Sequence, residues 1–426
     1  MSKTRRVFSI VIFTFVSALL LSSCATGPDN NQNSLRPKGE AAEKILNLYS
    51  PIFWIATTIG TGVLIAAIYV SIRYRATEKN KSPKQVHGNS VLEIGWTILP
   101  LVILIGVAIP TVKTVFDLDK KAGPGAVNVE VVGKQWWWQF GVKTDQYQVF
   151  NPDGTPKLNE FSKPTYADTV YTANELVVPV DTQIQLNIKA CDAETPVLKK
   201  TTDELKKANP CNVIHSFWIP SLGGKADAVP GRDHRLVLKA KEKGIYTGQC
   251  AEYCGLSHSV MRMQIRAVSR AEYDNWLANM KKPPVTSSVA ATGAKATSAQ
   301  AAIQKFGCAN CHTMDDPSLP SYGPNLTHFG QDFDNEVLGG GSIPKTYDHI
   351  WKWIFNATDW ENGNGIPMQS DDCRLGVAPG PGKRCNGMPN FSAEYRSTDE
   401  KGRELILPAM TEQEAKDIAT YLAKNK

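Results

Sequence analysis

Two long apolar stretches near the amino terminus constrain the fold more than any other feature of this sequence. They run from Ile52 to Ile72 and from about Ile94 to Phe116, and each meets the roughly 20 residues that a helix needs to cross a bilayer. Between them lies RYRATEKNKSPK, in which five basic residues stand against one acid. Positive charge marks a cytoplasmic loop. The sequence therefore predicts a transmembrane hairpin with both outer ends, and everything after about Lys120, on the export side.

The first 23 residues are predicted to be an export signal. A basic start (Lys3, Arg5 and Arg6) precedes an apolar run from Val7 to Leu21, and small residues then lead to Cys24. The final LSSC is typical of a lipoprotein signal, in which this cysteine receives the lipid. The alternative is an uncleaved membrane anchor with an unmodified cysteine. Both interpretations place the following segment, residues 24–120 with the hairpin, at the membrane.

Residues 121–282 change to an alternation of apolar and polar side chains. VNVEVVGKQWWWQF, ELVVPVDTQIQLNIKA, HRLVLKAKEKGIYTGQC and RMQIRAV each show it, and this period indicates half-buried strands. Strands without intervening helices favour an antiparallel Greek-key sandwich or barrel. SRAEYDNWLANMKK follows with Ser269 and Glu272 placed as a helix capping pair. Because the net charge of +6 is spread among interspersed acids and bases, no nucleic-acid binding is predicted.

The loop CAEYCGLSH holds two thiols, a carboxylate and an imidazole. In an oxidising compartment Cys250 and Cys254 would ordinarily form a disulfide. Thiolates combined with imidazoles, however, select copper, zinc or iron–sulfur clusters, and a weak methionine ligand on a sandwich is typical of copper electron carriers. His258 and Met261 follow the cysteines, and His215 is the candidate for a second histidine. A zinc site would not explain the methionine.

This set resembles the binuclear copper A centre of subunit II of the haem-copper cytochrome c oxidases, and the resemblance covers Ile52 to about Lys282. It implies a cupredoxin-like sandwich, two bridging cysteines, one histidine on each copper, a weak methionine ligand and a backbone carbonyl ligand. In this chain these are, in that order, Cys250 and Cys254, His215 and His258, Met261, and Glu252. The resemblance also implies that the carboxylate of Glu252 binds magnesium at the boundary with subunit I.

Other segments resemble the same family. LEIGWTILP implies that Glu93 marks the cytoplasmic mouth of a proton channel, although a solvated interface glutamate would look the same. KADAVPGR implies that Asp227 and Arg232 lie in a hydrogen-bond network over the haem propionates. QWWWQF implies that electrons enter at Trp136, although packing is the commoner role of a single tryptophan.

A lysine-rich insertion precedes the copper histidine and departs from simpler members of the family. Cys191 and Cys211 flank it, and they are interpreted as a disulfide at its base. Asn212 stands where members that dock a soluble cytochrome often carry an acid. The docking surface of such members is therefore in doubt here.

A second redox motif follows a small, polar segment, residues 283–297, that is interpreted as a flexible linker. In GCANCH, Cys308, Cys311 and His312 form C-x-x-C-H, the attachment signature of a c-type haem. Two thiols bond the vinyl groups of such a haem, and the histidine binds its iron. Thioredoxin-like and zinc sites share C-x-x-C but not the histidine that follows.

Residues 298–426 resemble a small all-α class I cytochrome c. GPNL resembles the loop beside the axial histidine, YDHIWKWIFN a middle helix, and TEQEAKDIATYLAK a terminal helix capped by Thr411 and Glu414. The sixth iron ligand in such domains is usually a methionine. GMPNF is the best family match, which favours Met388 as axial ligand over Met368; Met410 is interpreted as packing.

Cys373 and Cys385 bracket an insertion between the two leading methionines and are interpreted as a second disulfide. This completes the use of the nine cysteines: one lipid anchor, two copper ligands, two haem thioethers and two disulfides. No thiol is left over, which supports the scheme as a whole.

The resemblance predicts subunit II of a proton-pumping cytochrome c oxidase with a fused cytochrome c domain, in the bacterial inner membrane with its copper and haem domains on the periplasmic side. Its partners would be subunit I, subunit III, membrane lipid and an upstream donor such as a cytochrome c or the quinol–cytochrome c reductase complex. Oxygen would be reduced in subunit I. The alternatives are a membrane-anchored electron carrier for another copper A-dependent reductase and a copper-delivery module, both of which leave part of the motif set unexplained.

Overall fold

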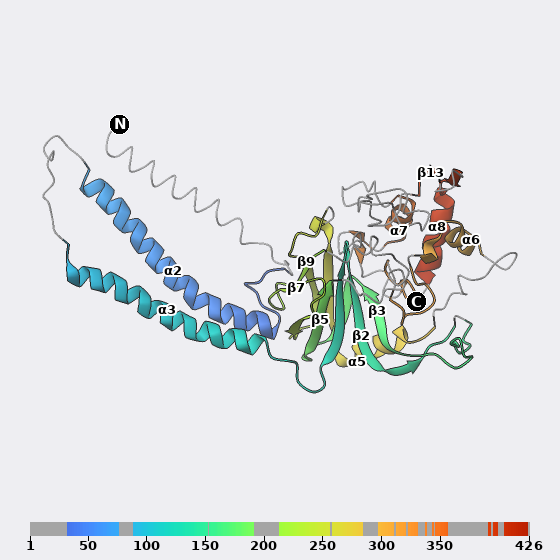
Figure 1. Cartoon of the computed structure of the whole chain (residues 1–426), viewed down its shortest axis with the longest axis horizontal. Helices are drawn as coiled ribbons and strands as arrows, with labels where there is room; N and C mark the ends of the chain where they lie inside the picture. The colour runs from blue at the N-terminus through green and yellow to red at the C-terminus, as the bar shows by residue number, and fades with distance from the viewer. Residues whose placement is uncertain are drawn as a thin grey trace.

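The computed structural model describes three consecutive parts of the chain. Its described residues are 32–75, 88–151, 153–190, 213–255, 258–283, 297–310, 312–320, 323–330, 337–338, 343–344, 346–356, 391–392, 395–398 and 404–424. A helical hairpin projects from one side of a β-sandwich, and a group of shorter helices lies on the other side of that sandwich (Figure 1).

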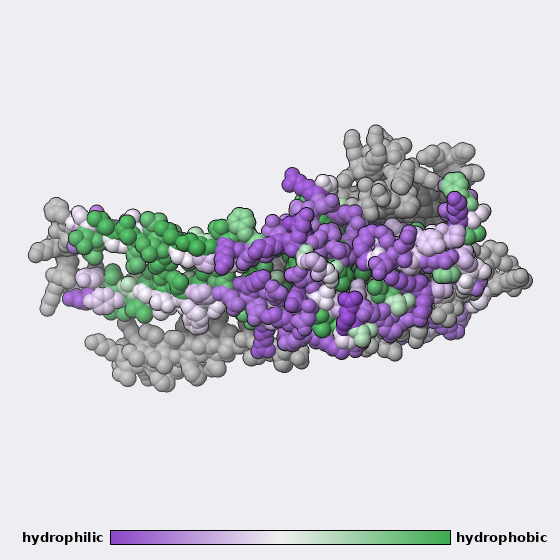
Figure 2. All heavy atoms as spheres, turned by 90° about the horizontal axis from the view of Figure 1, so that it is seen from below, coloured by the Kyte–Doolittle hydropathy of each residue, from purple (hydrophilic) through white to green (hydrophobic). Residues whose placement is uncertain are grey.

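The hairpin consists of α2 (Glu40–Arg73) and α3 (Ser90–Leu118). Both are long and apolar enough to cross a membrane by length and composition. Their side chains are apolar and exposed along most of their length, in contrast to the hydrophilic surface of the sandwich (Figure 2). The side chain of Asn89 caps α3 by accepting from the backbone N–H groups of Val91 and Leu92.

α2 begins twelve residues before the predicted start, because its first turn packs against the sandwich rather than entering a bilayer. Ala41 and Ala42 are buried, and the backbone N–H of Ala42 donates to the carbonyl of Leu222 over 3.1 Å. An ion pair between Glu43 and Lys241 adds to this attachment. The membrane hairpin and the sandwich are therefore joined through a continuous helix.

Two five-stranded sheets form the sandwich. The first has the order β3-β2-β1-β5-β8 and the second β4-β10-β9-β6-β7. Their bounds are β1 (Val127–Lys134), β2 (Trp137–Gln148), β3 (Tyr166–Ala173), β4 (Glu175–Pro179), β5 (Ile184–Ala190), β6 (His215–Trp218), β7 (Ala226–Ala228), β8 (His234–Leu238), β9 (Gly244–Cys250) and β10 (Arg262–Val268). The strands predicted from the alternating pattern are all present, and a cupredoxin-like sandwich is confirmed.

The prediction of purely antiparallel sheets is wrong at two pairs, since β1 pairs with β5 and β4 with β10 in parallel. The cause is a crossing between sheets at Asn174, the single residue between β3 and β4, which has a φ of 60°. Its backbone and side chain hydrogen-bond the backbone of Trp138 on β2, while its carbonyl accepts from Gln264 on β10. Because β4 thereby joins the second sheet, β5 returns to the first sheet beside β1 in the same direction.

Aromatic side chains fill the space between the sheets. Trp138, Phe140 and Phe217 are fully buried, and Phe217 meets the other two rings edge-on at centroid distances of 5.4 and 6.2 Å. α5 (Arg270–Met280) then closes the domain. Its predicted capping box is confirmed, because Ser269 and Glu272 hydrogen-bond each other's backbone N–H.

The C-terminal region contains α6 (Ser298–Lys305), α7 (Tyr347–Phe355) and α8 (Glu412–Lys424) around one apolar cluster. The helices predicted in the middle and at the end are present as α7 and α8, and α6 precedes C-x-x-C-H. Thr411 and Glu414 form the predicted cap of α8. Two short hairpins add strands that the all-α prediction did not include: β11 (Val337–Leu338) with β12 (Ile343–Pro344), and β13 (Tyr395–Thr398) with β14 (Glu404–Leu407). Tyr395, Thr398 and Ile406 are residue types that are enriched in strands.

Candidate metal centre

The residues predicted to bind copper come from three separate places in the second sheet. His215 is the first residue of β6, Cys250 is the last residue of β9, and Met261 immediately precedes β10. Cys254 lies in the loop after β9, and His258 opens the short 3-10 helix η5 (His258–Val260). Pairing of β9 with both β6 and β10 brings these elements together at one end of the sandwich.

Backbone hydrogen bonds fix the loop that carries the cysteines. The N–H of Cys250 donates to the carbonyl of Met261 over 2.9 Å, and the N–H of Ala251 donates to the carbonyl of Ser216 over 2.9 Å. The loop is thereby tied to both neighbouring strands. The donor side chains are held by the fold itself.

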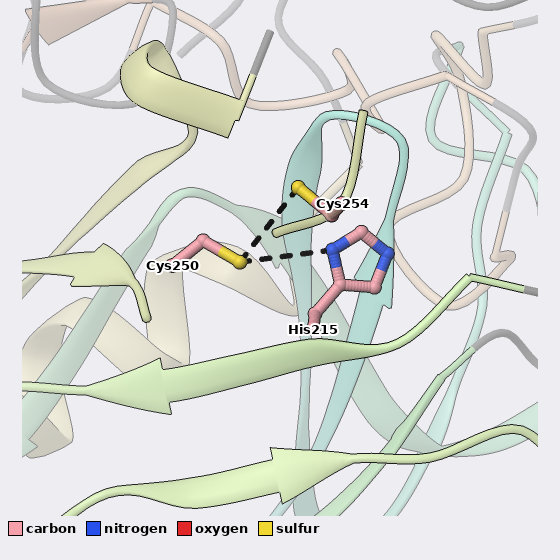
Figure 3. A group of neighbouring side chains, drawn as sticks. All are labelled: His215, Cys250 and Cys254. Carbon is pink, nitrogen blue, oxygen red and sulfur yellow. Dashed lines mark hydrogen bonds between the residues drawn. The ribbon is translucent and has the colours of Figure 1, made fainter. Parts of the chain in front are cut away.

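The five side chains converge on one another. Cys250 Sγ lies 3.8 Å from Cys254 Sγ and 3.9 Å from His215 Nδ1 (Figure 3). Cys254 Sγ lies 3.6 Å from His258 Nδ1 and 3.6 Å from Met261 Sδ. Each cysteine therefore faces its own histidine, and the two sulfurs face each other.

Burial is nearly complete at this cluster. Cys250, Cys254, Met261 and His215 are all at most 4% exposed. The Cys250 thiolate accepts a hydrogen bond from Cys254, which lowers the pKa of Cys250 to about 4, with a smaller contribution from His215. The same hydrogen bond and burial raise the pKa of Cys254. The two sulfurs thus favour a state in which they share one proton.

This donor set fits a soft metal. Thiolate–metal bonds are about 2.3 Å long, so sulfurs 3.8 Å apart can contact the same ion. Two thiolates, imidazole nitrogens and a thioether match the ligands that copper prefers, whereas a structural zinc site does not use methionine. The carbonyl of Glu252, 3.2 Å from Cys250 Sγ, offers a hard oxygen at the same place. The group can therefore hold the copper pair that the sequence predicts.

Two glycines and a glutamine near the cluster were not identified from the sequence. A Cβ on Gly133 of β1 would stand 2.9 Å from the His215 ring, and one on Gly255 would stand 2.9 Å from Gln135 Nε2. Gln135 Nε2 also donates to the carbonyl of Cys254 over 2.6 Å. Gly133 interrupts a strand pattern, which indicates a close approach of another group, so this signal was available in the sequence.

Trp136 lies directly against the cysteine loop. Its Nε1 donates to the carbonyl of Cys254 over 3.0 Å. The side chain is only 3% exposed, so it belongs to the core as well as to the metal site.

The side chains of the other predicted residues of the oxidase interface are exposed. Glu252 has an exposed side chain whose Oε1 accepts from the backbone N–H of Tyr253. Asp227 and Arg232 are exposed on the edge strand β7 and the turn after it. Glu93 lies in the first turn of α3. Of these four residues, Glu252 reaches the cysteines through its backbone carbonyl, 3.2 Å from Cys250 Sγ, while its side chain is exposed.

A second candidate site surrounds His312 in the C-terminal region. Its Nδ1 hydrogen-bonds the carbonyl of Pro324 over 2.8 Å, which leaves Nε2 available as an acceptor or ligand. A Cβ on Gly323 would stand 2.7 Å from His312 Cε1, so the predicted GPNL loop does pass beside this ring. Burial lowers the pKa of His312 and favours the neutral form that binds metals. The side chain thus fits an axial iron ligand, with Cys308 preceding it at the start of the 3-10 helix η7 (Cys308–Asn310).

Several predicted site residues lie outside the described residues. They are Cys24, Cys191, Cys211, Cys311, Met368, Cys373, Cys385 and Met388. Met410 is described, and it is buried in the apolar cluster of the C-terminal region, which agrees with the packing role predicted for it.

Fold and site together define a membrane protein whose β-sandwich carries a thiolate–imidazole metal site. The chain matches the family model "Cytochrome C oxidase subunit II, transmembrane domain" over residues 30–114 and "Cytochrome C oxidase subunit II, periplasmic domain" over residues 194–268. It therefore belongs to the cytochrome c oxidase subunit II family and is a component of an oxidoreductase complex with other oxidase subunits.

The similar proteins include "Cytochrome c oxidase subunit 2" of Alkalihalophilus pseudofirmus, 30% identical over 83% of this chain and 89% of the relative. The protein of the same name from Bacillus sp. (strain PS3) is 32% identical over 82% of this chain and 88% of the relative. Among solved structures, the periplasmic domain of subunit II of cytochrome oxidase from Bradyrhizobium japonicum is 28% identical over 38% of this chain and 97% of that chain, with a TM-score of 0.25. The family and the two apolar helices indicate a membrane protein with a periplasmic domain.

Proposed function

We propose that this chain is the electron-receiving subunit II of a proton-pumping cytochrome c oxidase, with a binuclear copper A centre and a fused c-type haem domain. Electrons from a cytochrome c or a quinol–cytochrome c reductase complex would pass through the C-terminal haem and the copper pair to the haems of subunit I, where oxygen is reduced to water. The copper and haem supply the redox chemistry. The chain's own residues hold these groups, exclude water and set the path between them.

The observation that carries this proposal is the convergence at one buried cluster of Cys250 and Cys254, His215 and His258, and Met261. A disulfide would use the two thiols and leave both imidazoles without a purpose at the site. The Nδ1 of His215 lies 3.9 Å from Cys250 Sγ, so it is the ring nitrogen that would bind copper. The arrangement supports one histidine for each copper and two shared thiolates.

Two observations support the fused haem domain. The Pro324 carbonyl orients the His312 ring so that Nε2 is free for iron, and such hydrogen bonds are what fix metal-binding histidines. In addition, the first 282 residues are about two thirds of the chain, so a similarity over 83% of it extends into the C-terminal region. Met388 remains the proposed second axial ligand, with Met368 as its rival.

The remaining roles follow from the family resemblance. Glu93 would accept protons at the cytoplasmic end of α3, and the exposed carboxylate of Glu252 would bind magnesium at the boundary with subunit I. Asp227 and Arg232, exposed on the edge of the second sheet, would contact subunit I near its haem propionates. Trp136 would conduct electrons toward the cysteine loop, which its hydrogen bond to Cys254 supports.

The proposal also includes a lipid site, two disulfides and a further partner subunit. Cys24 would carry a lipid, and Cys191–Cys211 and Cys373–Cys385 would be disulfides. Subunit III is expected beside subunit I. Service to another copper A-dependent reductase is the alternative, but the match to the oxidase transmembrane domain over residues 30–114 favours the oxidase.

Spectroscopy on the full chain, purified from membranes in detergent, tests the proposal. We expect a c-type haem absorption band and an electron-spin signal from one unpaired electron shared by both coppers. A signal from an isolated copper, or none after copper loading, would overturn the copper A assignment. A Met388→Leu variant should shift the haem band; if only Met368→Leu does so, the axial ligand is Met368.

A further inference from the structure

A small contact, here called the β3 seam, joins the C-terminal region to the sandwich. On the sandwich side it consists of Tyr171 on β3 and Lys157 on the hairpin after β2, and on the other side of Asp316 and Pro317. β3 is an edge strand of the first sheet, paired with β2 only. The Tyr171 N–H donates to the Pro317 carbonyl over 2.9 Å. The C-terminal region thus occupies a backbone position that a neighbouring strand would otherwise take.

An ion pair with unequal burial strengthens this seam. Lys157 Nζ lies 2.7 Å from Asp316 Oδ2, and the Asp316 side chain is only 1% exposed while that of Lys157 is 29% exposed. A carboxylate so deeply buried needs a cation and hydrogen bonds to remain charged. Its second oxygen accepts from the backbone N–H and the hydroxyl of Ser318. Lys157 therefore supplies from the other domain the charge that Asp316 requires.

Lys157 is itself held rigidly. Its backbone N–H donates to the carbonyl of Val149 over 3.0 Å, and its carbonyl accepts from the N–H of Thr165 over 2.8 Å. The Asp316 charge also acts on a side chain of the sandwich. Burial is the main cause that raises the pKa of Tyr147, and the negative charge of Asp316 raises it further. The seam thus joins one fixed position on the sandwich to one fixed position on the C-terminal region.

Asp316 is also connected to the ring of His312. Its backbone carbonyl accepts from Asn325 Nδ2 over 2.8 Å. Asn325 follows Pro324, whose carbonyl hydrogen-bonds His312 Nδ1 over 2.8 Å. The backbone of Asp316 is therefore connected to the His312 imidazole through two hydrogen bonds, the Asn325 side chain and the peptide bond between Pro324 and Asn325.

We propose that the Lys157–Asp316 ion pair is a docking latch that seats the C-terminal domain on the edge of β3, and that Asp316 is a positioning residue for His312. Through this docking contact, the orientation of His312, the candidate iron ligand, depends on contact between the C-terminal region and the copper domain. The latch itself stands on described contacts alone, while the positioning role rests on the proposed haem function.

Lys157→Met in the full-length protein tests the latch without reference to any cofactor. Removing one partner of a buried pair leaves the other charge unpaired, so we expect amide hydrogen exchange in β3, the peptide containing Tyr171, to accelerate roughly tenfold or more. Lys305→Met is the matched control, because Lys305 forms a 2.7 Å ion pair with Glu414 inside the C-terminal region. It should leave β3 exchange unchanged.

Two further variants keep the test decisive if Lys157→Met folds poorly. Lys157→Arg keeps the charge and should preserve most of the β3 protection. Asp316→Asn should accelerate exchange, and the double variant Lys157→Met with Asp316→Asn should be no worse than the single variants, because coupled partners are not additive. Unchanged β3 exchange in both single variants, or strict additivity in the double variant, would overturn the latch.

The positioning role has its own readout, the reduction potential of the attached haem. We expect Lys157→Met to shift it and Lys305→Met to leave it in place. The shift should persist at high salt, since a direct effect of the partly exposed Lys157 charge would be screened there. Faster β3 exchange without a lasting shift would overturn the positioning role but keep the latch. A chain without covalent haem would instead contradict the proposed function, and the exchange result would still decide the latch.

Discussion

The two candidate redox sites of this chain are built in different ways. The copper site gathers donors from β6, from the end of β9 and from the segment before β10, and its sulfurs and one imidazole are almost completely buried. The site at His312 is local: the ring and the loop that holds it lie within twelve residues of each other. The first site therefore depends on the sheets, and the second on one loop and its contacts. Mutations at one site should therefore leave the spectroscopic signal of the other site unchanged.

The largest effect is expected at Cys254, which the proposed function assigns to both coppers. Cys254→Ser removes the sulfur that faces Cys250, His258 and Met261 within 3.8 Å. We expect the shared-electron signal to vanish and copper content to fall, because a hydroxyl cannot replace a bridging thiolate for a soft metal. Metal analysis and electron-spin spectroscopy of the purified chain measure this. An intact signal would refute the bridging role, and the haem band, which belongs to the other site, should not change.

The second largest effect is expected at the local site. A Cβ on Gly323 would stand 2.7 Å from His312 Cε1 and 3.0 Å from Nδ1, so Gly323→Ala must displace the ring from Pro324. We expect a changed haem spectrum and a loss of stability of about 1–3 kcal/mol from overpacking.

Gly330→Ala is the matched control for that change. Its Cβ would press on the backbone carbonyl of Ala423 in α8 and on no part of His312. It should destabilise the C-terminal region to a similar extent and leave the haem spectrum intact. If both variants alter the spectrum equally, the Gly323 contact has no special role at the ring.

A finer comparison is possible between two methionines of the copper domain. Met261 Sδ lies 3.6 Å from Cys254 Sγ, whereas Met263 is an equally buried side chain two residues further on. Replacing either with leucine conserves volume and should cost less than about 1.5 kcal/mol of stability. Only Met261→Leu should shift the absorption and the reduction potential of the copper centre. Equal shifts in both variants would exclude Met261 as a ligand.

The smallest effects are expected at the two helix caps, one in each domain. Hydrogen bonds from Lys243 and Ser269 lower the pKa of Glu272 to about 2, below its usual 4.5. As pH falls, the Glu272 carboxylate is protonated near pH 4.5 in the unfolded chain but only near pH 2 in the folded chain. The stabilisation that Glu272 provides is therefore present above pH 4.5 and is lost as pH falls toward 2. Thermal unfolding of Glu272→Gln should show a lower transition for the copper domain at pH 7, and the difference should disappear near pH 2.

Glu414 provides the corresponding test in the C-terminal region. Burial raises the pKa of Glu414, but hydrogen bonds from Lys305 and Thr411 outweigh it, and the net shift is downward. Glu414→Gln should therefore lower the transition of the C-terminal region at neutral pH and leave that of the copper domain unchanged. A single transition that moves in both variants would mean that the two domains unfold together.

The sequence predicts the copper cluster well because its donors stand in a short motif and next to strand ends. His215 is the exception, since 35 residues separate it from Cys250; it was named as a candidate because the site needed a second histidine, and no local motif connects it to the cysteines. Gln135 was not identified, because its role depends on how the segment after β1 lies against the cysteine loop. The parallel pairs were missed for a similar reason: alternation gives the faces of a strand but not its neighbours.

Other features of the structure depend on contacts that no local sequence pattern encodes. The early start of α2 could not be read from hydropathy, because its first turn is polar on one side and packs through Ala41 and Ala42. The docking of Lys157 on Asp316 joins residues 159 positions apart, and no local pattern reports such a contact. The choice between Met388 and Met368 remains a prediction, as both lie outside the part of the chain that the structure describes.

The uninterrupted course of α2 from the hydrocarbon region to the sandwich has a mechanical consequence. Its 34 residues span about 51 Å at 1.5 Å per residue, which exceeds the roughly 30 Å of a bilayer core. The surplus, which includes Pro51, forms a helical pillar, and the backbone at its top donates to the carbonyls of Ser221 and Leu222. One residue inserted into that pillar would raise the metal site by about 1.5 Å and turn it by about 100° about the helix axis. The helix length thus sets both the height and the heading of the metal site above the membrane.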